Sequence, residues 1–267
     1  FTPWVAGTHR CELLLGENGA APASAGTARV EVLAAQGPVR GYIRVEPETK
    51  RFLQYADGTP MPLLGSNLCW PTGRGTYDYD DWFAAFADAG MNFSRIWMWP
   101  MAFGIEVLPG ERLNYNQLQA WRLDHAMSLA ADKGVAVMLC MDYHGIFQEE
   151  KDMWGGNDYW PTHPYNRSQG GPCAKQNDFF TDPDARKLYV KRLRYMVARY
   201  GAWPSLLSWE FFNEINNVYH KLDRADVVRW HGDMADTLHG LDPFHHPVTT
   251  SFGSQIEDRE MWAVPSL

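Results

Sequence analysis

The spacing of hydrophobic and polar positions changes partway along the chain. Up to residue 46, short segments alternate between apolar and polar residues and are separated by turn-forming residues, which predicts β-strands at residues 8–15, 28–33 and 40–45. A loop of small residues at 16–26 separates the first two. Residues 1–46 are therefore expected to be the C-terminal part of an all-β module.

A second pattern follows, in which short apolar runs alternate with amphipathic segments. A hairpin at residues 52–60, with Asp57 and Gly58 as its turn, leads into this region. The apolar runs predict strands at 62–67, 92–98, 135–141, 206–212 and 248–252, and the start of a sixth strand at 261–267. The amphipathic segments predict helices at 79–89, 116–133, 183–200 and 225–238.

Regular alternation of strands and helices indicates an α/β fold with a parallel sheet, either open and doubly wound or closed into a barrel. An open sheet usually carries a glycine-rich phosphate loop after its first strand, but residues 67–72 read Asn-Leu-Cys-Trp-Pro-Thr. We therefore expect a (β/α)8 TIM barrel at residues 47–267. The chain begins at Phe1 without a leader and stops at Leu267 without a cap, so we expect a segment of a longer protein, truncated after about the sixth strand.

The chemistry of a barrel is found at the C-terminal ends of its strands. Polar and aromatic residues gather at those positions here: Asn67, Trp70, Arg95, Trp97, Trp99, Asp142, Tyr143, His144, Asn213, Glu214 and Ser251. A long connection between residues 145 and 180 adds Trp154 and Trp160, and we expect it to form a wall of a binding cleft. Exposed tryptophan faces there would stack on sugar rings; the alternative is that these side chains only fill space.

Charge and composition narrow the range of partners and cofactors. The net charge of -8 does not suit a nucleic-acid partner. No apolar run reaches the 18 or so residues needed to span a membrane. The four cysteines have no C-x-x-C spacing, so no zinc site is expected, and nothing in the sequence calls for a cofactor.

Glu214 is the candidate for acid catalysis. Glycosidic bonds are cleaved by two carboxyl groups, one of which donates a proton to the leaving oxygen. Glu214 follows Asn213 at the end of the fourth predicted strand, where Asn213 would bind a sugar hydroxyl beside the bond that breaks. The alternative is that this Asn–Glu pair only caps the next helix.

The run Leu-Ser-Trp-Glu-Phe-Phe-Asn-Glu at residues 207–214 resembles the fourth-strand signature of the retaining (β/α)8-barrel glycoside hydrolases, the clan that includes family 5 cellulases and mannanases. The resemblance implies that Glu214 is the general acid/base. It also implies that Arg95 supports the catalytic nucleophile and that His144 lines the cleft.

A wider resemblance covers nearly the whole chain. Residues 65–67, 92–98, 163–172, 178–182 and 192–195 are similar to segments of bacterial family-5-like hydrolases that carry a β-sandwich before the barrel. It implies that residues 1–46 end an Ig-like sandwich. It also implies hydrolysis of β-linked poly- or oligosaccharides in an extracellular or periplasmic location, with the strand-end residues and Trp154 and Trp160 contacting the substrate.

The sequence departs from this clan at its nucleophile, a second glutamate at the end of the seventh strand. The chain stops near the sixth strand, so we expect the nucleophile beyond the C-terminus and expect this segment alone to be inactive. Glu210 does not replace it, because it would lie about 13 Å back along the strand, inside the barrel; we expect it to pair with Arg95. Asp142 is expected in the cleft, but not as a substitute nucleophile.

Two other functions also fit the sequence. A metal-dependent barrel hydrolase is suggested by Asp142 and His144, since both residue types bind metals, but the His-x-His spacing expected on a first strand is absent. A non-catalytic sugar-binding barrel would use the same aromatic residues. The sequence does not choose among mannan, β-glucan and other polysaccharides, nor between endo and exo action.

Overall fold

The computed structural model describes residues 6–16, 21–34, 40–108, 110–112, 114–153, 155–253 and 258–267. Contacts divide the chain into two compact units, residues 1–40 and residues 41–267. The predicted boundary lay after residue 46.

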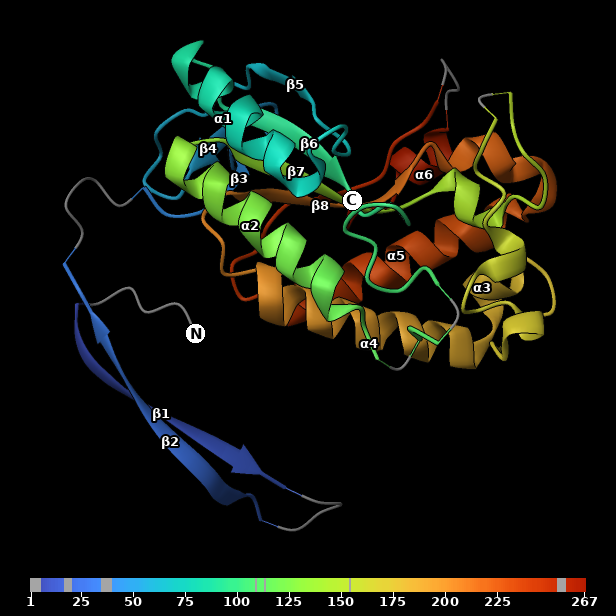
Figure 1. Cartoon of the computed structure of the whole chain (residues 1–267), viewed down its shortest axis with the longest axis horizontal. Helices are drawn as coiled ribbons and strands as arrows, with labels where there is room; N and C mark the ends of the chain where they lie inside the picture. The colour runs from blue at the N-terminus through green and yellow to red at the C-terminus, as the bar shows by residue number, and fades with distance from the viewer. Residues whose placement is uncertain are drawn as a thin grey trace. The chain divides into compact units, whose positions relative to one another are not determined.

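The first unit contains a β-hairpin (Figure 1). Strand β1, Gly7–Leu15, pairs antiparallel with β2, Ala23–Val32. Strand β2 begins earlier than predicted, because the small residues at its start pair with the end of β1. Most side chains of the hairpin are exposed, including those of Leu13, Leu14 and Leu15. The described residues of this unit do not show the predicted sandwich.

A second hairpin opens the larger unit. Strand β3, Ile43–Val45, pairs antiparallel with β4, Leu53–Tyr55. The predicted turn after β4 is confirmed, because Gly58 has a φ of 87° and the Tyr55 amide donates to the Thr59 carbonyl. Ile43 packs with Met61 against Ala136 and Leu207, which lie at the start of two central strands. The hairpin thus covers the N-terminal end of the main sheet.

The main sheet has five parallel strands in sequence order. They are β5 (Gly65–Asn67), β6 (Phe93–Trp97), β7 (Ala136–Tyr143), β8 (Leu206–Asn213) and β9 (Val248–Thr249). All five predicted strands are confirmed, although β5 and β9 are shorter than expected. Gly65 permits the close pairing of β5 with β6, since a Cβ there would lie 1.8 Å from the Phe93 carbonyl oxygen.

The predicted start of a sixth strand at residues 261–267 is wrong. This segment forms a short helix, α6, at Arg259–Trp262, followed by turns. The Asp258 side chain caps the helix by accepting a hydrogen bond from the Met261 amide, and Arg224 and Tyr219 hold the same carboxylate. An Asp cap favours a helix over a strand at this position.

Four long helices follow the predicted pattern: α1 (Asp78–Asp88), α2 (Gln117–Lys133), α4 (Pro183–Tyr200) and α5 (Arg224–Leu241). The side chains of Asn116, Asp182 and Asp223 cap the last three of them. Helices α2, α4 and α5 run along the sheet (Figure 1). None of the described helices is long and apolar enough to cross a membrane.

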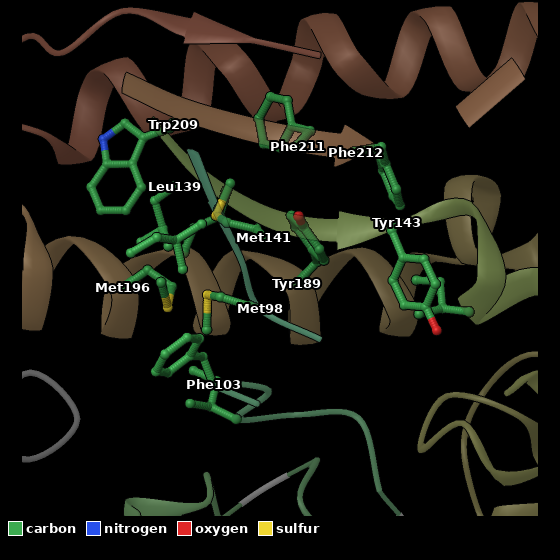
Figure 2. Close-up of a cluster of buried hydrophobic side chains, with 14 of the residues drawn as sticks. Met98, Phe103, Leu139, Met141, Tyr143, Tyr189, Met196, Trp209, Phe211 and Phe212 are labelled. Atoms are coloured by element: carbon green, nitrogen blue, oxygen red, sulfur yellow. The ribbon is translucent and has the colours of Figure 1, made fainter. Parts of the chain in front are cut away.

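The core between the sheet and these helices is rich in aromatic and methionine side chains. Leu139 and Met141 of β7 lie near Met196 of α4, and Phe211 and Phe212 of β8 extend the cluster (Figure 2). The long connection from β7 to α4 also packs side chains into this core. It contains four short helices: η2 (His144–Phe147), η3 (Trp160–Thr162), η4 (Arg167–Gln169) and α3 (Asp178–Thr181).

Candidate active site

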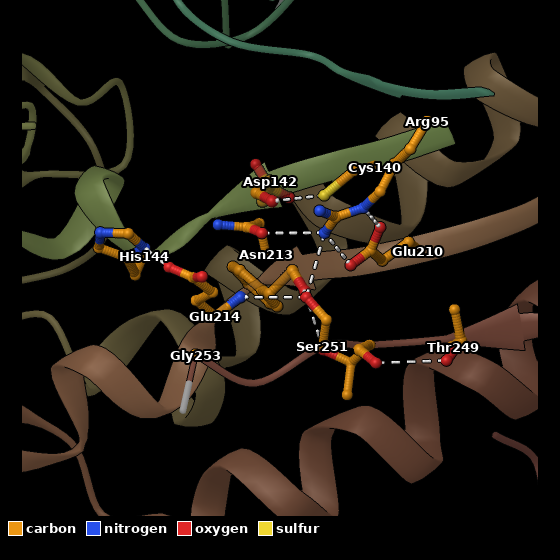
Figure 3. A network of polar contacts seen from close by, with 12 residues as sticks. Arg95, Cys140, Asp142, His144, Glu210, Asn213, Glu214, Thr249, Ser251 and Gly253 are labelled. Carbon is orange, nitrogen blue, oxygen red and sulfur yellow. Dashed lines mark hydrogen bonds and ion pairs between the residues drawn. The ribbon is translucent and has the colours of Figure 1, made fainter. Parts of the chain in front are cut away.

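Strands β6 and β8, which flank β7, are joined by an ion pair between Arg95 and the buried Glu210. Arg95 donates from Nε and Nη2 to the two carboxylate oxygens of Glu210 at 2.6 and 2.5 Å (Figure 3). The Glu210 side chain has no exposed surface. Burial opposes the charge on Arg95, but the Glu210 carboxylate more than compensates and raises the pKa of the guanidinium. The predicted pairing of Glu210 with Arg95 is confirmed.

The same guanidinium holds the residue before Glu214. Arg95 Nη2 donates to the Asn213 side-chain oxygen at 2.9 Å and to the Ser251 hydroxyl at 3.1 Å. The side-chain nitrogen of Asn213, Nδ2, is buried and has no hydrogen-bond partner among the described residues. A buried amide without a partner is unfavourable, so this nitrogen suits a donor role toward a bound molecule.

Glu214 follows β8 directly, in a turn that directs its side chain outward. Its backbone is left-handed, with φ 55° and ψ 44°, and its amide donates to the Ser251 hydroxyl at 3.3 Å. This conformation costs a residue with a Cβ about 1–2 kcal/mol, so neighbouring contacts must hold it. The Glu214 side chain is 39% exposed, and its Oε2 accepts a hydrogen bond from Asn217 at 3.0 Å.

Gly253 closes one side of Glu214 (Figure 3). A Cβ on Gly253 would lie 2.9 Å from the carboxyl carbon of Glu214 and 3.0 Å from the side-chain oxygen of Asn217. Asn216 fixes the Gly253 backbone by donating to its carbonyl at 2.7 Å and accepting from its amide at 2.8 Å. The site therefore requires glycine here to leave room for the Glu214 carboxylate.

His144 stands on the other side of Glu214. Its Nδ1 is 3.8 Å from Glu214 Oε2. Burial lowers the pKa of His144, while the Glu214 carboxylate and a hydrogen bond with the Asn213 backbone oppose the shift. The imidazole is therefore neutral near neutral pH, and the contact with Glu214 is not an ion pair under those conditions.

A pocket of about 500 Å³ opens in front of these groups. Its lining consists of Trp70, Trp97, Trp99, Tyr143, His144, Gly155, Gly156, Asn157 and Glu214. The ring centroid of Trp70 lies 5.1 Å from that of Trp97 and 5.3 Å from that of Trp99. Among the described residues of this lining, Glu214 alone carries a carboxylate. The pocket thus joins apolar ring faces to a single acidic group.

Eight of the predicted site residues divide into three groups. Trp70, Trp97, Trp99, His144 and Glu214 line the pocket. Arg95 and Asn213 lie directly behind it, where they support Glu214. Asn67 ends β5 opposite Arg95 and is exposed, but it is not part of the pocket lining.

Two predicted contact residues are placed in the protein interior. Asp142 is 2% exposed; its carboxylate accepts from Arg192 at 2.9 Å and from the Tyr189 hydroxyl at 2.9 Å. Trp160 is 3% exposed and packs against Phe147 and His163. Neither side chain has access to the pocket, which corrects their predicted contact with substrate. Trp154 lies outside the described residues.

Sequence reasoning missed the wall formed by Gly155, Gly156 and Asn157. Asn157 has a φ of 72°, and its side chain donates to Asp152. The run Gly-Gly-Asn is a turn signal that permits such a backbone, but it does not tell which surface the turn faces. Asn217 was missed as well, because its contact with Glu214 depends on the helical turn that follows β8.

Proteins of known function share this fold and, more weakly, this sequence. Mannan endo-1,4-beta-mannosidase 1 of Oryza sativa subsp. japonica is 26% identical over 257 residues, which cover 90% of this chain and 55% of that protein. Mannan endo-1,4-beta-mannosidase 7 of Arabidopsis thaliana is 25% identical, over 78% of this chain and 48% of its own length. The chain spans about half the length of these curated relatives.

Solved structures agree on the fold. The endo-1,4-beta-mannanase of Rhizomucor miehei superposes with a TM-score of 0.60 at 15% identity, over 85% of this chain and 70% of that one. The beta-mannanase of the blue mussel Mytilus edulis gives a TM-score of 0.56 at 14% identity, over 80% and 64%. These neighbours imply a (β/α)8 barrel, of which the structure shows five parallel strands.

One family model accounts for most of the larger unit. It is described as Cellulase (glycosyl hydrolase family 5) and matches residues 55–249, well over half of the chain. The matched range contains β5 to β9 and the residues around Glu214. The chain belongs to glycosyl hydrolase family 5.

Proposed function

We propose that this protein hydrolyses β-1,4-linked mannan with retention of configuration and that Glu214 is its general acid/base. The observation that carries this proposal is the position of Glu214, the one carboxylate among the described residues of an aromatic pocket, in a strained turn at the end of β8. The choice of mannan draws on the curated relatives, which are named for that substrate.

Glu214 would act twice in a retaining reaction. It first gives its proton to the leaving glycosidic oxygen as the bond from that oxygen to the anomeric carbon breaks, while a second carboxylate bonds to that carbon. In the second half, Glu214 removes a proton from water, which attacks the same carbon and releases the second carboxylate.

The second carboxylate is proposed to come from outside the described residues. Retaining enzymes place their two carboxyl groups about 5–5.5 Å apart. Glu210 is engaged by Arg95, and Asp142 is engaged by Arg192, so neither is free to attack a sugar. Arg95 lies beside Asn213 at the base of the site, where its charge would favour an incoming carboxylate.

Substrate binding would use the pocket around Glu214. The unpartnered amide nitrogen of Asn213 would donate to a hydroxyl beside the cleaved bond. Trp70, Trp97 and Trp99 would stack against the apolar faces of sugar rings. Neutral His144 would form a hydrogen bond with Glu214 both when the glutamate is protonated and when it is ionised.

The test is Glu214→Gln in the full natural polypeptide. We expect kcat on β-1,4-mannan, followed by release of reducing ends, to fall about 10²–10⁴-fold, because the acid is lost. The affinity for mannohexaose, measured by calorimetry, should change little, because glutamine keeps the shape of the side chain. Glu260→Gln, at a glutamate whose side chain is 66% exposed, is the control. Unchanged turnover in Glu214→Gln would remove Glu214 from the mechanism.

Non-catalytic sugar binding is the second candidate, supported by the single carboxylate among the described residues of the pocket lining. The same experiment separates it. Binding of mannohexaose without any release of reducing ends by the wild-type protein would favour the binding module. A metal-dependent reaction gains no support from the described part of the chain, where no group of three or more His, Cys, Asp or Glu is placed to hold a metal ion.

A further inference from the structure

A buried charged cluster lies behind the pocket and takes no part in the proposed reaction. It consists of Glu106, Asp142 and Arg192, each no more than 2% exposed. Arg192 extends from α4 and donates from Nη1 to both oxygens of Asp142 at 2.9 and 3.0 Å. Its Nη2 donates to the Met141 carbonyl at 2.5 Å, and its Nε lies 3.8 Å from the Glu106 carboxylate. One guanidinium thus binds Asp142 and the backbone of β7 directly, and it faces Glu106 without a hydrogen bond among the described residues.

Each partner of Arg192 belongs to a segment that also forms the pocket wall. Asp142 directly precedes Tyr143 and His144 in the chain. Glu106 lies in the connection from β6 to α2, which contains Trp99. The third segment, the connection from β7 to α4, carries Gly155, Gly156 and Asn157.

The third segment is joined to the cluster by one tyrosine. The Tyr165 hydroxyl donates to Glu106 Oε2 at 3.2 Å, and Tyr165 is itself 1% exposed. Because Glu106 also faces Arg192, the hydrogen bond ties the β7–α4 connection to the same guanidinium. The three wall segments therefore share one fixed point on α4.

The charge balance of the cluster is compatible with its burial. Two ionised acids beside one arginine would leave an uncompensated charge in the interior, which is costly. Burial raises the pKa of Glu106 to about 8, although Arg192 opposes the rise. Near neutral pH, Glu106 is therefore mostly protonated. Burial also raises the pKa of Asp142, while Arg192 and Tyr189 oppose that rise.

We propose that Arg192 is a positioning residue, which holds the three segments of the pocket wall at their relative spacing through Asp142, Glu106 and Tyr165. Arg192 does not touch the pocket and acts only through these partners. The effect on sugar binding rests on the proposed function of the pocket, whereas the effect on the wall segments does not.

Tyr165→Phe tests the proposal, with Tyr200→Phe as a matched control. Both changes remove one hydroxyl from a buried tyrosine, and the Tyr200 hydroxyl donates to the Ala120 carbonyl of α2, away from the pocket. Hydrogen exchange of the sugar-free protein is the first measurement. We expect faster exchange at residues 99–107 and 155–160 in Tyr165→Phe and no change there in Tyr200→Phe. Equal exchange in the two variants would overturn the proposal.

Sugar affinity is the second measurement. Tyr165→Phe should raise the Kd for mannohexaose about fivefold, the equivalent of one neutral hydrogen bond, while Tyr200→Phe leaves it unchanged. An unchanged Kd in Tyr165→Phe, or an equal rise in both variants, would contradict the positioning role. If the wild-type protein fails to bind mannohexaose, the proposed function is wrong and the exchange experiment alone decides the role of Arg192.

Discussion

At the scale of single residues, the site depends on two positions. One carries a side chain although its backbone conformation favours glycine, and the other has no room for a side chain. Glu214 has a side chain in a backbone conformation that favours glycine, and Gly253 has no side chain because the Glu214 carboxylate occupies that space. The contacts of Ser251 and Asn216 hold both backbones in place. Small changes here should therefore affect turnover more than stability.

Gly253→Ala is the direct test of this constraint. The added methyl group would push the Glu214 carboxylate away from its position, and we expect kcat to fall about tenfold to a hundredfold, since a displacement near 1 Å is enough for such a loss. Gly240→Ala is the control, because a Cβ on Gly240 meets nothing within 4 Å. Equal activity of the two variants would show that Glu214 tolerates the displacement.

The raised pKa of Glu106 predicts how the stability of the protein depends on pH. Its pKa is raised from 4.5 to about 8, chiefly by burial, so the folded protein holds a proton there that the unfolded chain has released. The charged and titratable groups that interact with it include Arg192, Asp142, Tyr165, Lys191, Tyr115 and Tyr189. Because the folded state binds more protons over this interval, the contribution of Glu106 to stability is fully present below about pH 4.5 and is lost as the pH rises through about 8.

Glu106→Gln should remove this dependence. The free energy of unfolding of the wild-type protein, relative to the variant, should fall by up to about 1.4 kcal/mol per pH unit between the two pKa values. Urea denaturation of both proteins at several pH values across the interval measures the difference. A difference that does not vary with pH would mean that Glu106 is ionised in the folded protein.

At the scale of elements, helix α4 has a stabilising role that is separate from the chemistry. It carries Arg192 on its buried side and begins at Pro183, after the Asp182 side chain accepts hydrogen bonds from the amides of Asp184 and Ala185. The cap and the proline both act locally, within the first turn of the helix.

Asp182→Ala should lower the free energy of unfolding by about 1 kcal/mol, the usual effect of losing such a cap. The measurement is thermal or urea denaturation. Asp132→Ala, near the C-terminal end of α2, is the control and should not destabilise, since a negative charge at that end of a helix is unfavourable. We expect kcat to stay within about twofold of wild type in both variants, since neither aspartate reaches the pocket. Equal stability of the two variants would argue against the cap.

At the scale of the whole molecule, the elements were more predictable than their contacts. Hydrophobic periodicity is local, and it located the five strands and four long helices. The predicted sixth strand failed because Asp258 caps a helix there; Arg224 and Tyr219, which are distant in sequence, hold the same carboxylate. Position at a strand end suggested Asp142 as a contact residue, but only the placement of Arg192 on α4 decides which way that carboxylate turns.

The site was predictable where the motif is contiguous. The sequence around Glu214 suggested the glutamate and its neighbour Asn213. The pairing of Glu210 with Arg95 was also predicted, although Arg95 is distant in sequence, and the structure brings these groups together. Gly253, Asn157 and the Arg192 cluster were not predictable. Their roles depend on contacts between loops that hydrophobic patterning does not encode.

The left-handed backbone of Glu214 also bears on how this position would change over generations. If the pocket only held sugar, selection for stability alone would favour glycine or asparagine at residue 214, since both adopt φ near 55° at lower cost than glutamate. A glutamate that persists at such a position is a stability cost without benefit unless its carboxyl group is used. If Glu214 is the acid, a chain released from catalysis should therefore lose this residue early.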